Sequence, residues 1–261
     1  MSFADLHRGP GALLLPNAWD VASAMAFLDA GDAAIGTTSL GVAASHGEPD
    51  AARTSKDRTR AIAHALRVLP CAISVDIEDG FDDEPDRVAT YVDDLGVVGV
   101  NIEDSTRGSL IDPVAHAHKV AAIKRRCGVD VFVNARVDTY WLGQDATVEH
   151  TVGRARHYVD AGADGIFVPG GLDADQIAAL ASGVRVPLNV LPQPGTSLDE
   201  LTALGVRRVS SGSLPFRAAL DAALSSLDHV RAGTAPAAVP YADVQRRSEA
   251  YGRSAPWAHT T

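Results

Sequence analysis

The chain has 261 residues, enough for one large domain, and single α/β barrels commonly need roughly 250 residues. Hydrophobic residues make up 46% of the chain and charged residues 21%, which is typical of a folded globular protein and excludes a disordered or fibrous one. The formal net charge of -10 argues against binding to nucleic acid, because the phosphate backbone would be repelled.

The cysteine pattern and the apolar runs indicate the compartment. Cys71 and Cys127 are too few for a disulfide framework, and no N-terminal signal segment precedes them. No run of about 18 apolar residues appears, so we expect no membrane span. These features predict a protein of a reducing cytoplasm.

Strand-like apolar runs alternate with helix-like runs along the whole chain. Strands are expected over residues 13–15, 33–37, 72–76, 97–102, 131–135, 165–168, 188–190 and 208–210. Helices are expected over residues 21–30, 61–68, 85–95, from 112 onward, 147–161, 173–182, 198–204 and 216–224, with a long polar loop over 39–57. Strict alternation implies a parallel sheet, and eight units at this length imply a closed (β/α)8 TIM-type barrel.

A weak internal repeat supports the count of eight units. Four predicted helices end in a glycine just before a strand, at Gly31, Gly96, Gly162 and Gly205. A doubly wound open sheet is the competing architecture, but no Gly-x-Gly-x-x-Gly follows the first strand.

The C-terminal part differs in composition from the barrel. We expect residues 1–233 to form the barrel catalytic domain, and residues 234–261 to form an Ala/Pro linker, a helix over 241–251 and a frayed tail over 255–261. This extension either packs on a neighbouring subunit or forms a local cap.

Acids cluster where the third and fourth predicted strands end. Asp76 and Glu78 follow the third strand, and Glu103 follows the fourth. Buried unpaired carboxylates are costly unless a cation or several donors accompany them, and a few carboxylates with retained waters are how Mg²⁺ is usually held. We therefore predict a Mg²⁺ site, with Mn²⁺ as an alternative. The competing interpretation is that these acids pair with Arg136 or cap helices.

Further polar residues end later strands, where barrel enzymes place their reactive groups. Arg136 follows the fifth strand and can contact a carboxylate through two nitrogens or stabilise an oxyanion, or serve as a buried counterion to Glu103. Asn189 and Ser211 fall at the ends of the seventh and eighth strands. Such convergence predicts one polar site.

The segment after the second strand supplies hydroxyls and closely spaced N–H groups, a pattern that suits an anion cradle. This turn comprises Thr37, Thr38, Ser39, Leu40 and Gly41, of which the last four are the candidate substrate-binding residues. The following turn-rich loop carries Asp50, either as an acid on a mobile lid or as an ordinary exposed loop acid.

The histidines and cysteines form no reactive pattern. His116 and His118 lie two apart on a predicted helix, and we expect both to be solvent-exposed. Cys71 and Cys127 each precede a strand, so we expect them in the core or at the rim opposite the site.

Several short motifs together resemble the isocitrate lyase and phosphoenolpyruvate mutase superfamily. They cover most of the first half of the chain in the expected order, and they comprise residues 15–20, 37–39, 41–45, 47–50, 75–80, 101–104 and 134–136. The resemblance implies a barrel, an oligomer with an exchanged terminal helix, and a Mg²⁺ site for 2-oxo or 2-hydroxy carboxylates that react through an enolate.

The resemblance also implies roles for single residues. Asp76 corresponds to the direct metal ligand, Glu78 and Glu103 to acids that hold metal-bound waters, Arg136 to a contact with the substrate oxyanion or carboxylate, and Asp50 to the acid on the mobile loop. Candidate substrate-binding residues are Trp19, Thr38, Ser39, Leu40, Gly41, Asn189 and Ser211.

The chain departs from the superfamily pattern at three places. Many members have Asp where this chain has Glu78, so the water network is expected to shift. The Lys-Lys/Arg-Cys-Gly-His loop of the lyases is replaced by residues 105–110, and residues 169–171 replace the Glu or His of other branches. These departures argue against isocitrate or methylisocitrate cleavage and weaken the case for phosphonomutase chemistry.

Three functions therefore stand at this point. The first is a Mg²⁺-dependent enzyme that acts on a small 2-oxo or 2-hydroxy carboxylate by C–C cleavage, hydrolysis or decarboxylation. The second is phosphonopyruvate mutase-type C–P chemistry, and the third is a noncatalytic metabolite-binding barrel. We expect a homo-oligomer, dimer or tetramer, with a small carboxylate as its partner and with neither nucleic acid nor membrane.

Overall fold

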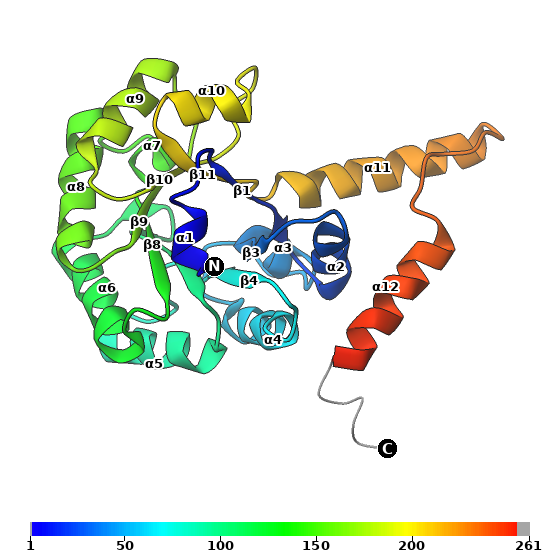
Figure 1. The fold of residues 1–261 in the computed structure, drawn as a ribbon, viewed down its shortest axis with the longest axis horizontal. Coiled ribbons are helices and arrows are strands. Elements are labelled where there is room, and N and C mark those ends of the chain that lie inside the picture. The colour runs from blue at the N-terminus through cyan, green and yellow to red at the C-terminus, as the bar shows by residue number, and fades with distance from the viewer. Residues whose placement is uncertain (1, 255–261) are drawn as a thin grey trace.

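The computed structural model describes residues 2–254 and contains a closed, parallel (β/α)8 barrel of the TIM type (Figure 1). The sheet runs in the order β1-β11-β10-β9-β8-β5-β4-β3-β2. Its strands are β1 (Leu13–Leu15), β2 (Asn17–Ala18), β3 (Ala34–Thr37), β4 (Ala72–Asp76), β5 (Gly99–Glu103), β8 (Phe132–Arg136), β9 (Gly165–Val168), β10 (Leu188–Val190) and β11 (Val206–Ser210). The predicted fold class is confirmed.

Two of these strands are halves of one barrel position. Pro16 has no N–H to donate and separates β1 from β2, while its carbonyl still accepts a hydrogen bond from Gly36 N–H at 2.8 Å. β1 pairs with β11 and β2 pairs with β3, so the barrel closes across Pro16. Counting the interrupted strand once gives the eight positions that the sequence predicts.

Helices cover the outside of the sheet. They are α2 (Val21–Asp29), α3 (Ser39–Ala44), α4 (Lys56–Leu66), α5 (Pro85–Leu95), α6 (Pro113–Cys127), α7 (Thr139–Leu142), α8 (Val148–Asp160), α9 (Ala174–Gly183) and α10 (Leu198–Ala203), with α1 (Phe3–Leu6) before the barrel and α11 (Leu214–Arg231) and α12 (Tyr241–Ser254) after it. A two-stranded hairpin, β6 (Ser105–Thr106) and β7 (Ser109–Leu110), forms the loop after β5.

Three predicted boundaries are wrong, and the first is the start of α4, which was expected at residue 61 and lies at Lys56. The expected polar loop over 39–57 begins with helix α3, because Thr38 caps three buried apolar or small residues that follow it. The helix expected over 216–224 starts at Leu214 and continues to Arg231, since apolar residues recur at helical spacing beyond residue 224. The frayed tail expected over 255–261 lies outside the described residues.

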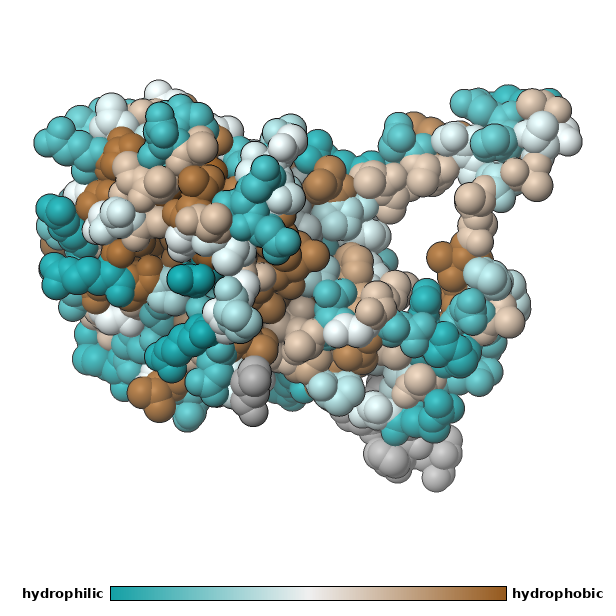
Figure 2. All heavy atoms as spheres, turned by 45° about the horizontal axis from the view of Figure 1, so that its top comes forward, coloured by the Kyte–Doolittle hydropathy of each residue, from teal (hydrophilic) through white to brown (hydrophobic). Residues whose placement is uncertain are grey.

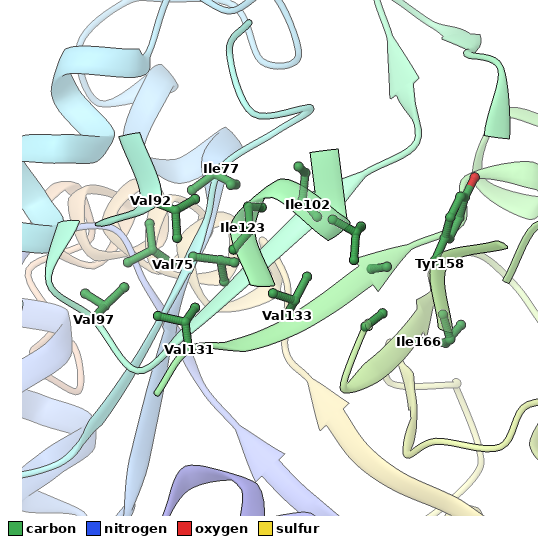
Figure 3. Packing of buried hydrophobic residues seen from close by; sticks show 14 of the residues in the cluster. Val75, Ile77, Val92, Val97, Ile102, Ile123, Val131, Val133, Tyr158 and Ile166 are labelled. Atoms are coloured by element: carbon green, nitrogen blue, oxygen red, sulfur yellow. The ribbon is translucent and has the colours of Figure 1, made fainter. Parts of the chain in front are cut away.

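The main core lies between the sheet and the helices. Figure 3 shows Val75 of β4, Val133 of β8 and Ile166 of β9 on the outward face of the strands, packed with residues of the covering helices such as Val92 of α5 and Ile123 of α6. Burial of such side chains is the main stabilising contribution to a barrel of this size. The alternate residues of the same strands face the barrel interior.

Helix α1 closes the amino-terminal end of the barrel. The ring of His7 stacks on Phe132 with 4.3 Å between centroids, and Phe3 packs edge-on against the same ring. Gly99 permits this plug, because a Cβ there would lie 2.6 Å from Phe3 Cε1. The reactive end of the barrel is therefore the opposite one.

His116 corrects the expectation of solvent exposure, while His118 is exposed as expected. His116 is fully buried on α6, and its ring lies edge-on to Tyr158 of α8 with 4.5 Å between centroids. It is buried because α6 packs against both α5 and α8. Cys71 and Cys127 are free, half-buried and packed at the edge of the core, as expected.

Helices α11 and α12 form an arm that stands off the barrel (Figures 1 and 2). Leu220, Leu224, Leu227 and Val230 recur along α11 and are each at least 50% exposed. α12 returns to its own barrel, where Arg246 and Arg247 pair with Asp29 of α2 at 2.8 and 3.1 Å. Within residues 2–254, no helix has both the length and the apolar character needed to cross a bilayer.

Candidate active site

A cavity of about 80 Å³ opens at the carboxyl ends of the barrel strands. A larger apolar hollow of about 900 Å³ lies around α1 at the opposite end, where barrels do not place reactive groups. The small cavity is lined by Asn17, Thr37, Thr38, Ser39, Leu40, Asp50, Asp76, Asn101, Arg136, Trp141, Phe167, Pro169, Leu191, Ser210, Gly212 and Ser213.

The structure brings half of the predicted site residues into this lining. Those that reach the cavity are Thr38, Ser39, Leu40, Asp50, Asp76 and Arg136. Those that stand behind its wall are Trp19, Gly41, Glu78, Glu103, Asn189 and Ser211. The second group supports the first through the contacts described below.

Asp76 ends β4 at the centre of the acidic group. Its Oδ2 accepts a hydrogen bond from Ser39 N–H at 3.2 Å, and its own N–H donates to Thr37 Oγ1 at 2.9 Å. Burial raises the pKa of Asp76, Arg136 opposes this shift, and the charge of Asp50 adds to it. An acid in such a position needs positive charge to stay ionised.

Arg136 supplies positive charge at the end of β8. Its Nη1 lies 2.9 Å from Glu103 Oε2, and its Nε lies 2.6 Å from Asp138 Oδ1. Burial disfavours the charged guanidinium, but Glu103, Asp138 and Asp76 outweigh that effect and raise the pKa of Arg136. Arg136 is therefore the predicted counterion of Glu103 and also lines the cavity, while its contact with a substrate stays a prediction.

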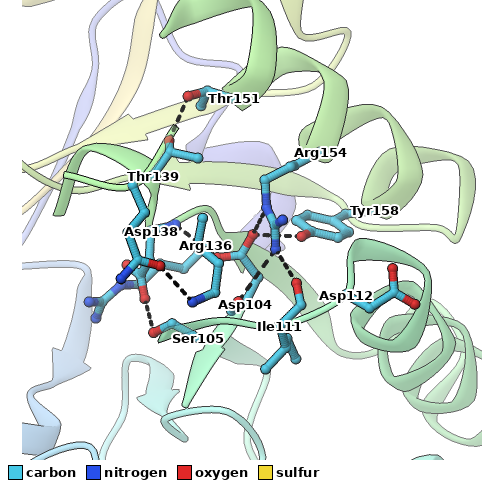
Figure 4. Close-up of polar contacts among 12 residues, drawn as sticks. Asp104, Ser105, Ile111, Asp112, Arg136, Asp138, Thr139, Thr151, Arg154 and Tyr158 are labelled. Atoms are coloured by element: carbon cyan, nitrogen blue, oxygen red, sulfur yellow. Dashed lines mark hydrogen bonds and ion pairs between the residues drawn. The ribbon is translucent and has the colours of Figure 1, made fainter. Parts of the chain in front are cut away.

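A buried network holds Arg136 from behind (Figure 4). Asp138 accepts from Arg136 on one oxygen and from Ser105 Oγ at 2.6 Å on the other. The Asp138 N–H donates to Asp104, whose other oxygen accepts from Arg154 Nε and from Tyr158 OH, both at 2.6 Å. Asp138 was not among the predicted residues, although its position two residues after Arg136 was the available signal.

Glu78 turns away from the cavity toward the loop that carries Asp50. Its carboxylate accepts from Ser55 Oγ at 2.5 Å and from Arg53 N–H at 2.9 Å. Burial raises the pKa of Glu78, and the two hydrogen bonds oppose that shift. Burial also raises the pKa of Glu103 well above its ordinary value, against the lowering effect of Arg136.

The segment after β3 is shaped by close packing. The Thr38 hydroxyl accepts from Gly41 N–H at the start of α3, and a Cβ on Gly41 would lie 2.8 Å from both Thr38 Cγ2 and Trp19 Cβ. Trp19 in turn packs edge-on against Phe216. Gly41 and Trp19 thus position the cradle, while Ser39 and Leu40 face the cavity.

The opposite wall is formed by residues of the first and last strand positions of the barrel. Asn17 N–H donates to Ser211 Oγ at 2.8 Å, and Asn17 Oδ1 accepts from Gly212 N–H at 3.0 Å. Asn189 Nδ2 donates to Ser210 Oγ at 3.0 Å. Asn189 and Ser211 therefore orient the lining residues. Lining residues missed by the sequence analysis include Asn17, Asn101, Trp141, Phe167, Ser210 and Ser213.

The donor set fits a hydrated hard cation. The charge of Asp50 raises the pKa of Asp76, and the charges of Asp50 and Asp76 raise those of Glu78 and Glu103, while Arg136 lowers the pKa of Asp76 and Glu103. Across the described residues, no three His, Cys, Asp or Glu side chains are arranged to hold a metal together. One direct carboxylate ligand with waters, as Mg²⁺ prefers, needs no such trio.

Enzymes with a (β/α)8 barrel place their active sites at the carboxyl ends of the strands, and this barrel has a cavity lined by Asp50 and Asp76 at that end. The fold and the site therefore define the class of barrel enzymes. The family model of phosphoenolpyruvate phosphomutase matches residues 3–231. The chain belongs to this family, and so to the phosphoenolpyruvate mutase and isocitrate lyase superfamily of enzymes, as its motifs predict.

Individual relatives extend this result. An uncharacterized protein of Mycobacterium tuberculosis is 52% identical over 95% of this chain and 96% of its own length. A solved structure from Burkholderia cenocepacia, described no further than as a lyase or mutase, has a TM-score of 0.86 and 37% identity, and covers 94% of this chain and 93% of its own. An oxaloacetate decarboxylase of Paraburkholderia xenovorans is 31% identical over 66% of this chain and 62% of its own length.

Proposed function

We propose that the protein is a Mg²⁺-dependent enzyme that cleaves a C–C bond of a small 2-oxo or 2-hydroxy carboxylate through an enolate, with Mn²⁺ as an alternative metal. The observation that carries the proposal is that Asp76, Arg136 and Asp50 line one cavity of about 80 Å³. A cavity of this size suits a substrate of a few heavy atoms. Decarboxylation of oxaloacetate is the first reaction to test, because a relative with 31% identity is an oxaloacetate decarboxylase.

Each lining residue has a role that follows from its chemistry. Asp76 would hold the metal directly, with Glu103 and Glu78 behind it, and bound Mg²⁺ supplies positive charge against a developing enolate oxygen. Arg136 orients the substrate carboxylate or enolate through its guanidinium N–H groups. Ser39 binds the substrate carboxylate, and Asp50 holds or moves a proton on the open side of the cavity.

Product analysis tests this proposal directly. The purified protein is incubated with oxaloacetate and Mg²⁺ and followed by carbon NMR, where pyruvate marks decarboxylation and oxalate with acetate marks hydrolysis. Parallel samples contain substituted malates and phosphonopyruvate, the latter followed by phosphorus NMR. Asp76→Asn is the matched control, because it keeps the shape of the side chain and removes its charge.

The same experiment separates the alternatives. Conversion between phosphonopyruvate and phosphoenolpyruvate would support C–P chemistry, and Mg²⁺-dependent binding without any product would support a noncatalytic binding barrel. Turnover that survives in Asp76→Asn would refute the assignment of the metal site.

We further propose that the protein is a homo-oligomer, a dimer or a tetramer. The support is the stripe of Leu220, Leu224, Leu227 and Val230 along α11, which is exposed in the single chain although such apolar surface favours burial. The division into a barrel over 1–233 and an extension over 234–261 stays a prediction, and the arm of α11 and α12 leaves the barrel earlier, at Leu214. The two free cysteines support a cytoplasmic location.

A further inference from the structure

Two strained segments face each other beside the cavity. Ala51 and Arg53 in the loop that carries Asp50, and Glu78 and Phe81 in the segment after β4, have φ angles of 55°, 61°, 48° and 59°. Non-glycine residues pay for this left-handed conformation, and they keep it only where surrounding contacts enforce it. The contacts that enforce it here join the two segments to each other.

Arg53 makes the main connection. Its Nε lies 3.0 and 2.8 Å from the two carboxylate oxygens of Asp79, and its Nη2 contacts both Asp79 and Asp83. The Asp79 side chain is 2% exposed, whereas that of Asp83 is 84% exposed. The pair with Asp79 is therefore shielded from solvent and carries most of the attraction, while Asp83 adds a screened contact.

Asp79 is itself fixed to the barrel frame. Buried Lys119 of α6 donates to the Asp79 carbonyl oxygen at 2.8 Å, and Phe81 N–H donates to the Asp79 carboxylate at 3.1 Å. Lys119 has no place in the cavity, so this anchoring explains why a lysine is buried there. The guanidinium of Arg53 thus binds the carboxylate of Asp79, which is fixed to the barrel and not to the loop.

Glu78 adds a second connection to the same loop. Both of its carboxylate oxygens accept hydrogen bonds from loop residues, one from Ser55 Oγ and one from Arg53 N–H. The extra methylene of glutamate over aspartate gives the carboxylate this reach. The loop is therefore tied at one point to the acid that follows Asp76 and at another to Asp79.

We propose that Arg53 is a positioning residue for Asp50: the Arg53–Asp79 pair, reinforced by Glu78 and Asp83, locks the loop over 46–55 in the closed position in which Asp50 lines the cavity with Asp76. This inference deepens the proposed function and rests on it only for the role of Asp50 in turnover. The lock itself is a property of the loop, so it is measurable without any substrate.

Hydrogen exchange read by mass spectrometry tests the lock. Arg53→Met should accelerate exchange over residues 46–55 by about 10- to 100-fold, the effect of losing a charge-assisted hydrogen bond, and should lower kcat more than it raises KM. Arg53→Lys should recover part of both effects, because it keeps the charge but loses the planar two-oxygen contact. Arg58→Met is the matched control: Arg58 lies near the same loop, pairs with Glu48 at 3.6 Å, is about half exposed and has no contact with Asp79.

Each outcome is informative. Faster exchange confined to 46–55 in Arg53→Met, with Arg58→Met unchanged, supports the lock, and unchanged exchange over 46–55 overturns it whatever happens to activity. Faster exchange in a protein that turns over no substrate of the panel keeps the lock and refutes the proposed function. If Arg53→Met does not fold, Arg53→Lys combined with Asp83→Asn replaces it, and exchange equal to that of the parent overturns the proposal.

Discussion

Replacing Asp138 with asparagine should destabilise the barrel and misorient Arg136. The carboxylate is fully buried, and it accepts from Arg136 Nε and from Ser105 Oγ at 2.6 Å each. Breaking a buried, hydrogen-bonded charge pair costs about 3–5 kcal/mol, and the retained pair with Glu103 at 2.9 Å places Asp138→Asn near the lower value. For a chain of this length, a loss of about 3 kcal/mol corresponds to a fall in Tm of about 6–12 °C.

Thermal and chemical denaturation measure this change, and turnover of the substrate found by product analysis measures the effect on Arg136. We expect kcat/KM to fall by about 100-fold, as when an aligned donor to a developing negative charge is lost. Ser105→Ala is the matched control, because it removes one neutral donor to the same carboxylate and should cost about 1 kcal/mol. An Asp138→Asn protein as stable and as active as the parent would refute the view that Asp138 orients Arg136.

The remaining predictions concern the metal, pH and assembly. Asp76→Asn, or removal of metal by EDTA, should abolish turnover and the increase in Tm on adding Mg²⁺, and a retained Mg²⁺-dependent increase in the variant would contradict the ligand assignment. Burial lowers the pKa of His116 from 6.5 to about 3, so the unfolded chain binds this proton first and stability should fall as pH drops from about 6.5 toward 3. His116→Phe should flatten that decline by about 1.4 kcal/mol per pH unit in urea titrations, and an unchanged slope would contradict the burial of a neutral His116. Leu224→Asp on α11 should reduce the oligomer mass measured by light scattering, with Asp221→Asn as the control, and an oligomer of unchanged mass would argue against this interface.

The fold was predictable because its signals are local. Strand-like runs, helix-ending glycines such as Gly96 and the absence of a dinucleotide motif each depend on a few neighbouring residues, and together they predict the barrel. Helix α3 was missed because Ser39 and Gly41 suggest a turn, whereas tertiary packing against Trp19 and Phe216 stabilises a helix there. The extent of α11 was missed because its apolar residues, such as Leu224, are exposed among residues 2–254, and a helix without a packed face gives a weaker signal.

Of the site residues, those at the ends of predicted strands were the ones that the sequence could identify. Asp76 and Arg136 were found because a charged residue directly after an apolar strand is conspicuous, and both line the cavity. Asn101 and Ser210 were missed, because a polar residue inside a strand gives no sign of which face it occupies. The direction of Glu78 depends on a left-handed φ of 48°, which no pattern of residue types reveals.

Closure of the barrel across Pro16 also bears on how the chain folds during synthesis. β1 pairs with β11, and Asn17 donates a hydrogen bond to Ser211, which lies 194 positions later in the chain. The first strand of the barrel therefore cannot pair on this side until the last strand has been synthesised. Contacts this distant in sequence form slowly, and until β11 emerges the edges of β1 and β10 remain unpaired and open to other chains. Chains that end before Val206 should therefore aggregate instead of forming a smaller barrel, and the wall of the cavity that holds Asn17 is among the last parts of the molecule to take shape.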